Sequence, residues 1–485
     1  MKFRRNNLLR SVALLLICLL ISGCSVKSHT PDDLSEVSNI WVVTEASVSD
    51  GMNHQLQLAM DQFTSLYPDL TFNLDILPID ENERSAYIDF LYAQIKAGQG
   101  PDVYLLPTSD VLVLEEPQPY TYRRIQPLFP DVNAAMHNGY FLDFNTWFQD
   151  DPAIDFSRLN LPVMDAGLIG QKRYALPLRY DCPVLYEYDN YMSRNQIDET
   201  ILCNGIDAWM QYAVSSNDPV IACSAEYITI QAFSNVVDYS DGSITLTHDS
   251  VRNYLKLLQK VQALIGDEYE HRTSASLIGY LHNIWTQFPL QINTLSNASF
   301  YAAIAKANGQ SLKMHPVRTT DGDYTATIKY YAAIGANTKL PQVAYEFIRQ
   351  FLSEDFQLEK NRLKPESKQY NGLIETSWPV LYRDSTSTLW ENLQQQVNSD
   401  YGLLDAARER QNSILEITLS DSDIPILNQE IDFGRFPVYF YPNMYTYAEQ
   451  LNDVTQNNTP SDVDINALSD TLLHNLSDFY QQIYN

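Results

Sequence analysis

Polar side chains that could bind a small molecule follow two short apolar runs of the chain. Thr44 and Glu45 come directly after one run, and Thr108 and Asp110 come just after the other. If both runs are parallel strands of an open α/β sheet, their carboxyl ends meet at one edge, where such sheets bind ligands. Carboxylate groups placed there, those of Glu45 and Asp110, would accept hydrogen bonds from the hydroxyl groups of a ligand.

Motifs for catalysis are absent from the sequence. It has no G-x-S-x-G elbow, no H-E-x-x-H pair, no P-loop and no G-x-G-x-x-G turn after a strand. None of the eight histidines lies three or four residues from another, which argues against a helical metal pair. The 60 acidic residues leave a glycosidase carboxylate pair open. We expect a binding protein without a metal or cofactor.

The two apolar runs belong to a stretch in which strands and helices alternate. The apolar pattern predicts strand, helix, strand, helix and strand over 40–43, 54–67, 70–76, 87–95 and 103–106. Gly98 and Gly100 can adopt the positive φ angles that end a helix, and Pro101 prevents its continuation. This order predicts a parallel sheet.

Three segments share their order with a known family. A helix carrying Phe63 and ending at Tyr67-Pro68 precedes the segment A-G-Q-G-P-D-V at 97–103. G-Q-K-R-Y-A-L-P follows at 170–177, and Y-Y-A-A-I-G-A-N-T-K follows at 330–339. Together they resemble the sugar-binding group of extracellular solute-binding proteins, the receptors of bacterial ABC importers.

The resemblance implies an α/β fold of the periplasmic-binding-protein type II class, with two lobes joined by a hinge that closes on a solute. It places Arg179, Tyr180 and Asp181 at the first crossing between the lobes, at the mouth of the cleft. It places Trp285 and Tyr331 on the other side of the ligand. Arg179 would favour an anionic solute, such as an acidic sugar.

Chain length agrees with two lobes, because the chain is too long for one hydrophobic core. We assign 39–178 with 332–365 to the N-terminal lobe. The C-terminal lobe with its closing helices takes 179–331 with 366–485.

The N-terminus has the pattern of an export signal. Residues 1–10 contain four basic and no acidic side chains, and 12–21 are apolar. The ending Ile21-Ser22-Gly23-Cys24 resembles a bacterial lipobox, which implies a signal peptide over 1–23 and a diacylglycerol-modified Cys24 that anchors the protein to a membrane. The polar segment 24–38 would be a flexible tether. A plain signal peptide with an incidental Cys24 is the alternative.

Charge and cysteine content bear on the partners and the redox state. The formal charge of −28 becomes −32 without the signal, which disfavours binding to nucleic acid. Cys182, Cys203 and Cys223 remain in the body, and we expect three buried thiols, with a disulfide between Cys203 and Cys223 as the alternative.

These observations predict a monomeric, lipid-anchored receptor on the extracytoplasmic face of the cell membrane. Its partners would be a small solute, a carbohydrate by resemblance, and the permease subunits of an ABC importer. Two alternatives stay open: an exported surface lipoprotein that hydrolyses glycosides, and a ligand-sensing receptor without transport.

Overall fold

A computed structural model of the chain describes the following residues: 39–45, 53–108, 111–114, 122–225, 233, 236–238, 241–265, 289–298, 301, 302, 305, 309–357, 378, 379, 429–437 and 462–484. The predicted signal, tether and lipidated Cys24 lie outside these residues, as do Asp110 and Trp285. No helix in the described part of the chain is both long and apolar enough to cross a membrane.

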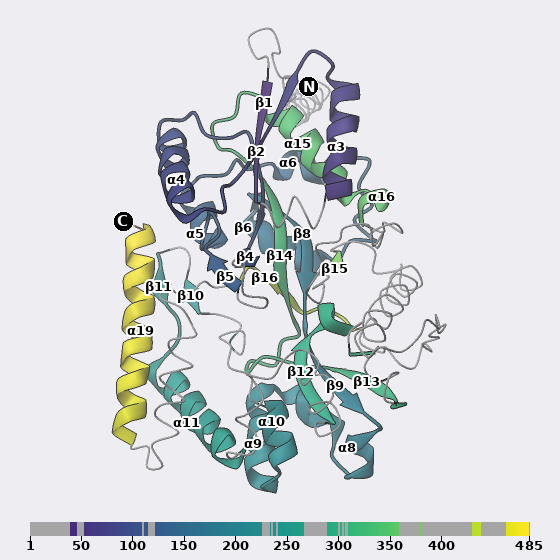
Figure 1. The fold of residues 1–485 in the computed structure, drawn as a ribbon, viewed down its shortest axis with the longest axis vertical. Coiled ribbons are helices and arrows are strands. Elements are labelled where there is room, and N and C mark those ends of the chain that lie inside the picture. Colours follow the sequence, from purple (N-terminus) through teal and green to yellow (C-terminus); the bar gives the residue numbers. More distant parts are fainter. Residues whose placement is uncertain are drawn as a thin grey trace, which may run out of the picture.

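The larger of the sheets is seven-stranded and occupies the upper half of the molecule in Figure 1. Its strands are β1 (Asn39–Thr44), β2 (Thr71–Ile76), β3 (Val103–Pro107), β8 (Ala175–Asp181), β14 (Thr325–Ile334), β15 (Trp378–Pro379) and β16 (Phe433–Arg435). Strand β1 lies parallel to β2 on one side and to β3 on the other, with Val42 opposite both Leu74 and Val103. Strand β14 pairs antiparallel with β3 and β8, which places it in the middle of the sheet.

Helices α3 (Asn53–Leu66), α4 (Glu81–Lys96) and α15 (Pro341–Arg349) belong to this lobe. The alternating order predicted from the apolar pattern is therefore confirmed from β1 to β3. Helix α4 begins after Asp80, whose carboxylate accepts hydrogen bonds from the amides of the first turn, and Gly98 follows its end with φ of 72°.

Asp102 connects two of the segments that carry the family resemblance. Its carboxylate accepts hydrogen bonds from the Trp41 amide (2.8 Å) and the Thr338 hydroxyl (2.5 Å). Its carbonyl accepts from the amide of Gly335, where an added Cβ would lie 2.0 Å from the Pro101 carbonyl oxygen. The Gly-Pro-Asp segment thus packs directly against the turn before α15. This close contact requires glycine at position 335 and is held by the hydrogen bonds of Asp102.

A second, three-stranded sheet lies in the lower half of Figure 1. It consists of β9 (Pro183–Tyr188) between β12 (Leu290–Thr294) and β13 (Leu312–Pro316), all antiparallel. Helices α9 (Ile206–Ser216), α10 (Pro219–Ala225) and α11 (His248–Ile265) pack near it around the buried Trp209.

The chain passes between the two sheets at Cys182, where β8 ends and β9 begins, and again between β13 and β14. We expected the first break near Arg179, Tyr180 and Asp181. These residues instead remain in β8, because they still pair with β14. The lobe boundaries given above stay a prediction.

The remaining elements are short: β4 (Val111–Leu114), β5 (Tyr122–Ile125), α5 (Val132–His137), α6 (Asn145–Gln149), α7 (Leu161–Met164), η1 (Asp165–Gly167), β6 (Leu168–Ile169), β7 (Lys172–Arg173), α8 (Tyr191–Arg194), η2 (Glu199–Asn204), β10 (Val237–Asp238), β11 (Ser243–Ile244), η5 (Leu295–Asn297), η6 (Gln350–Leu352) and α16 (Glu354–Gln357). Disulfides join none of the three body cysteines. Cys182 is buried as expected, but Cys203 is exposed and Cys223 is only half-buried, so the expectation of three buried thiols is wrong for these two residues.

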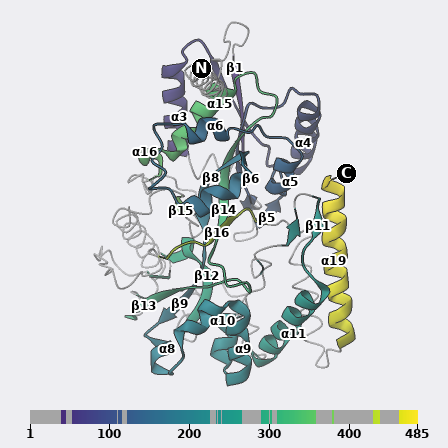
Figure 2. The same cartoon turned by 180° about the vertical axis from the view of Figure 1, so that it is seen from behind.

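The C-terminal helix α19 (Asp462–Tyr484) contacts both halves of the molecule, along whose flank it runs in Figures 1 and 2. Near its start, Ile465 and Leu468 pack into the core of the second lobe. Near its end, the buried Tyr480 donates a hydrogen bond to Asp131, the residue that caps α5 beside the first sheet. Helix α19 therefore bridges the two lobes.

Candidate ligand-binding site

The predicted residues Thr44 and Thr108 lie at the carboxyl ends of β1 and β3, as expected. Both side chains are buried, and both hydroxyl groups donate hydrogen bonds to backbone carbonyls inside the protein. Thr44 donates to Leu105 on β3 (2.8 Å), and Thr108 donates to Ile328 on β14 (2.5 Å). The two threonines thus hold neighbouring strand ends together at this edge of the sheet.

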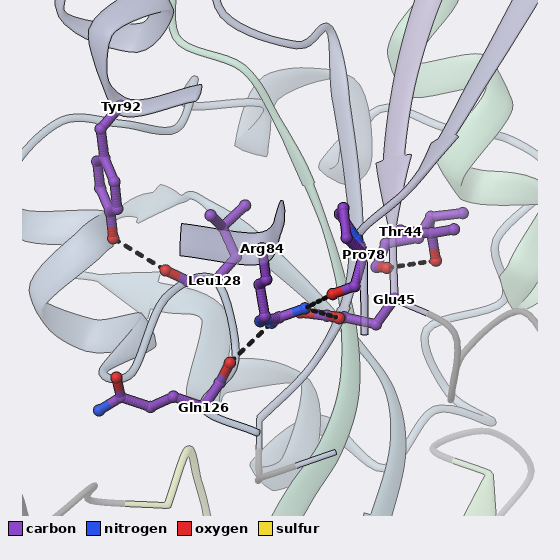
Figure 3. A network of polar contacts seen from close by, with 8 residues as sticks. Thr44, Glu45, Pro78, Arg84, Tyr92, Gln126 and Leu128 are labelled. Atoms are coloured by element: carbon purple, nitrogen blue, oxygen red, sulfur yellow. Dashed lines mark hydrogen bonds and ion pairs between the residues drawn. The ribbon is translucent and has the colours of Figure 1, made fainter. Parts of the chain in front are cut away.

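Glu45, the residue after β1, forms a buried ion pair with Arg84 in the first turn of α4 (Figure 3). The guanidinium meets both carboxylate oxygens, with Nη2–Oε1 at 2.6 Å and Nη1–Oε2 at 2.9 Å. Arg84 also donates to the carbonyls of Pro78 (3.1 Å) and Gln126 (2.7 Å). This two-point contact fixes the Glu45 carboxylate in one orientation.

Burial and Arg84 act in opposite directions on Glu45. Burial is the larger effect and raises the pKa of the carboxyl group, whereas the hydrogen bonds and charge of Arg84 lower it. Each carboxylate oxygen has a second lone pair, so Glu45 can accept a further hydrogen bond while Arg84 holds it. Arg84 was not among the residues predicted from the sequence, and no motif marks it.

The predicted residue Tyr331 lies in the middle of β14 and is fully buried. Its ring packs against Phe141 and Phe436, with centroids 6.3 Å and 5.5 Å away. Burial raises the pKa of its hydroxyl group most strongly, and the electrostatic effects of Tyr92, Tyr104 and Glu45 raise it further. That hydroxyl has no hydrogen-bond partner among the described residues.

Arg179, Tyr180 and Asp181 lie together at the end of β8, beside the first passage between sheets. Arg179 and Asp181 are buried, while Tyr180 is partly exposed. One Asp181 oxygen accepts hydrogen bonds from the amides of Cys182 (2.9 Å) and Ser296 (3.0 Å). Since Ser296 follows β12 of the second sheet, Asp181 connects the two lobes where the chain passes between them.

The second Asp181 oxygen has no hydrogen-bond partner among the described residues. Burial raises the pKa of this carboxyl group, and the positive charge of Lys329 partly opposes the rise. A folded-state pKa above the unfolded value means that the folded protein binds more protons. Its stability therefore falls as the pH rises through the folded-state pKa.

We expect Asp181→Asn to remove this pH dependence, because the amide oxygen keeps both hydrogen bonds and carries no charge. The free energy of unfolding, measured in urea at pH 4 and pH 8, should fall less with rising pH in the variant than in the unmodified protein. Asp155→Asn is the control, because hydrogen bonds from Ser157 lower the pKa of Asp155. Asp155 therefore titrates at a pH below the two that are compared, and its loss should leave the change in stability between pH 4 and pH 8 as it is in the unmodified protein. If the free energy of unfolding changes equally between pH 4 and pH 8 in Asp181→Asn and in the unmodified protein, Asp181 is not the group responsible.

Aromatic residues that the sequence did not single out line the second sheet. The rings of Tyr186 on β9 and Tyr301 stack with centroids 4.0 Å apart and planes 6° apart. Their hydroxyl groups bond to the Thr294 carbonyl (2.7 Å) and the Asn293 amide (2.8 Å). The alternation of apolar residues around Tyr186 predicts its strand, but no local signal indicates the stack with Tyr301.

No protein-family model matches the sequence, and no curated protein matches it. Among solved structures, a de novo designed cysteine esterase, ECH19, superposes with a TM-score of 0.53 at 13% identity, over 93% of this chain and 99% of that chain. An extracellular solute-binding protein of family 1 from Alicyclobacillus acidocaldarius has a TM-score of 0.47 at 13% identity, over 93% and 100% of the two chains. The sugar-binding protein MalE from Xanthomonas citri has a TM-score of 0.49 at 10% identity, over 92% and 99%.

At 13% identity, the superposition with the TM-score of 0.53 bears on the fold alone. Two α/β lobes, each with its own sheet, are what the resemblance led us to expect. The predicted fold class is confirmed: the chain has the two-lobed α/β fold of the periplasmic-binding-protein type II class.

Proposed function

We propose that this protein is an extracytoplasmic receptor that captures a carbohydrate between its two lobes and delivers it to the permease of an ABC importer. The observation that carries the proposal is that Thr44, Glu45 and Thr108 stand at the carboxyl ends of the neighbouring parallel strands β1 and β3, on one edge of the larger sheet. That edge is where open α/β sheets bind ligands.

The polar groups at this edge suit a neutral, hydroxyl-rich solute. Arg84 already neutralises Glu45, so the pair offers a fixed hydrogen-bond acceptor without a free charge. Fixing the acceptor before binding lowers the entropy cost of recognition. Tyr180 lies at the end of β8 in the same sheet, separated from β1 by β14 and β3, and adds a partly exposed aromatic ring. A ring face can pack against the C–H surface of a sugar.

Capture would depend on the passages of the chain between the lobes, such as the one at Cys182 and the one between β13 and β14. A ligand that contacts both lobes binds the closed arrangement more tightly than the open one, and so favours closure. Asp181 and Ser296 keep the first passage anchored on both sides during such a motion. Asp110 and Trp285 belong to this proposed site as sequence predictions.

Delivery to a permease requires that the receptor stay near the membrane. A diacylglycerol group on Cys24 would provide that anchor, and the polar segment 24–38 would give the lobes freedom to reach the permease.

A thermal-shift screen of the full chain in detergent, against mono- and oligosaccharides, tests the proposal. A sugar present at 100 times its dissociation constant should add about 2.7 kcal/mol to the free energy of unfolding. Stabilisation by peptides or anions but by no sugar would contradict the carbohydrate assignment. Turnover of a glycoside would support the hydrolase alternative instead.

Tyr180→Ala should weaken binding of the sugar found in that screen by tenfold or more, because the ring offers the apolar contact at this edge. Tyr174→Ala is the matched control, since Tyr174 is also partly exposed and precedes the same strand. Isothermal titration of both variants gives the comparison. Equal affinities would remove Tyr180 from the site.

A further inference from the structure

Three metal-binding side chains from distant parts of the sequence meet in the second lobe: Glu187, Glu199 and His315. One ligand atom from each lies within 4.8 Å of the others. This cluster is separate from the proposed sugar site, since it involves the second sheet and η2 but no residue of the larger sheet.

The sheet register explains why Glu187 and His315 are neighbours. Glu187 on β9 lies opposite Lys313, and His315 on β13 lies opposite Leu185. Because side chains alternate along a strand, Glu187 and His315 project from the same face as diagonal neighbours. Glu199 arrives from the first position of η2, whose preceding residue Asp198 caps it by accepting the Thr200 amide (2.9 Å).

The two ring nitrogens of His315 face different carboxylates at different distances. Nε2 lies 2.6 Å from Oε2 of Glu187, which is a direct hydrogen bond. Nδ1 lies 3.7 Å from Oε2 of Glu199, which is too long for a hydrogen bond. Two ligand atoms bound tetrahedrally to one zinc ion are roughly 3.4 Å apart, so this gap is close to the spacing that an ion needs.

Glu187 is placed to fix the histidine in the required tautomer. Its side chain is fully buried, and its other oxygen accepts the Met192 amide at 2.7 Å. A carboxylate acceptor 2.6 Å from Nε2 keeps the proton on that nitrogen and leaves the Nδ1 lone pair free, as in carboxylate–histidine–metal arrangements.

We propose that His315 Nδ1 and the Glu199 carboxylate bind a divalent transition-metal ion of the zinc class, with Glu187 as the hydrogen-bond acceptor that orients the histidine. The Glu199 side chain is 48% exposed and that of His315 is 12% exposed, so the ion reaches the site from solvent and water completes its coordination. One nitrogen and one carboxylate suit zinc better than magnesium, which prefers oxygen ligands alone. The bound ion would tie the edge strand β13 to η2.

Isothermal titration of Zn²⁺ into the full chain, stripped of metal with a chelator and held in detergent, tests the proposal. We expect one equivalent with micromolar affinity, and no competition from millimolar Mg²⁺. Glu199→Gln and His315→Ala should each abolish this binding, and Glu187→Gln should weaken it by about 10- to 100-fold. Cobalt in place of zinc should give a visible absorption band that His315→Ala loses.

The acidic chain can also bind cations without a specific site, so matched controls are needed. His474 on α19 forms an exposed pair with Asp478 at 3.3 Å, and Glu83 is an exposed glutamate on α4. His474→Gln and Glu83→Gln should leave zinc binding unchanged. The proposal is overturned if the unmodified protein binds no zinc at 1 mM, or if Glu199→Gln binds it as the unmodified protein does. Glu199 is half-exposed, so that variant is expected to fold whatever happens at Glu187.

Discussion

Arg84→Met is expected to lower the free energy of unfolding by about 3–5 kcal/mol, because it leaves the Glu45 carboxylate buried without its partner. The side chains of Arg84 and Glu45 are only 5% and 1% exposed, so water cannot replace the lost guanidinium. The backbone carbonyls of Pro78 and Gln126 lose a donor as well. Urea denaturation at pH 7 measures the loss.

Two further measurements separate the ion pair from a general effect of mutation. The double variant Glu45→Gln with Arg84→Met should recover most of the lost stability, because it removes the stranded charge as well as its partner. The deficit of the single variant should also shrink as the pH falls, since an unpaired buried carboxyl group becomes neutral by protonation.

The exposed pair of Asp249 and Arg252 on α11 provides the matched control for Arg84→Met. Its N–O distance is 2.8 Å, similar to that of the buried pair, but the aspartate side chain is 75% exposed. Arg252→Met should therefore change the free energy of unfolding by less than about 1 kcal/mol. A loss below 1 kcal/mol for Arg84→Met as well would show that the Glu45–Arg84 pair does not stabilise the strand ends.

The fold was predictable where short-range patterns determine it. Apolar periodicity located each element from β1 to β3, because strands and helices bury residues with different periods. The Gly-Pro-Asp segment marked a real junction, since Asp102 bonds both Trp41 and Thr338.

Contacts between distant residues were not predictable, because no local pattern records them. The sequence pointed to Glu45 at a strand end but gave no sign of Arg84, which is 39 positions away and lies on a different element. His315 is 128 positions from Glu187, so a search for closely spaced histidines could not find the cluster in the second lobe. Whether Thr44, Glu45, Thr108, Arg179, Tyr180, Asp181 and Tyr331 contact a ligand stays a prediction.

The contact between α19 and the first lobe is another such long-range feature, and its loss should have a large effect. Tyr480 is fully buried and packs with Leu476, Val236 and Val237 in a small cluster of its own. Tyr480→Ala removes the ring from this cluster together with its hydrogen bond to Asp131, and should cost about 3–5 kcal/mol of stability. Tyr480→Phe keeps the ring and removes only the hydroxyl, which should cost about 1–3 kcal/mol.

Hydrogen exchange distinguishes a link between lobes from ordinary core packing. If α19 anchors the first lobe through Tyr480, Tyr480→Phe should lower the protection of the amides in α5, the helix that Asp131 caps. The amides of α11, which packs in the core that holds Ile465 and Leu468, should keep their protection. Gln481→Ala, an exposed position one residue further on, should change neither protection nor stability by more than about 0.5 kcal/mol. Uniform loss of protection across both helices would instead mean that the two lobes unfold as one unit and that the Tyr480–Asp131 bond has no local role.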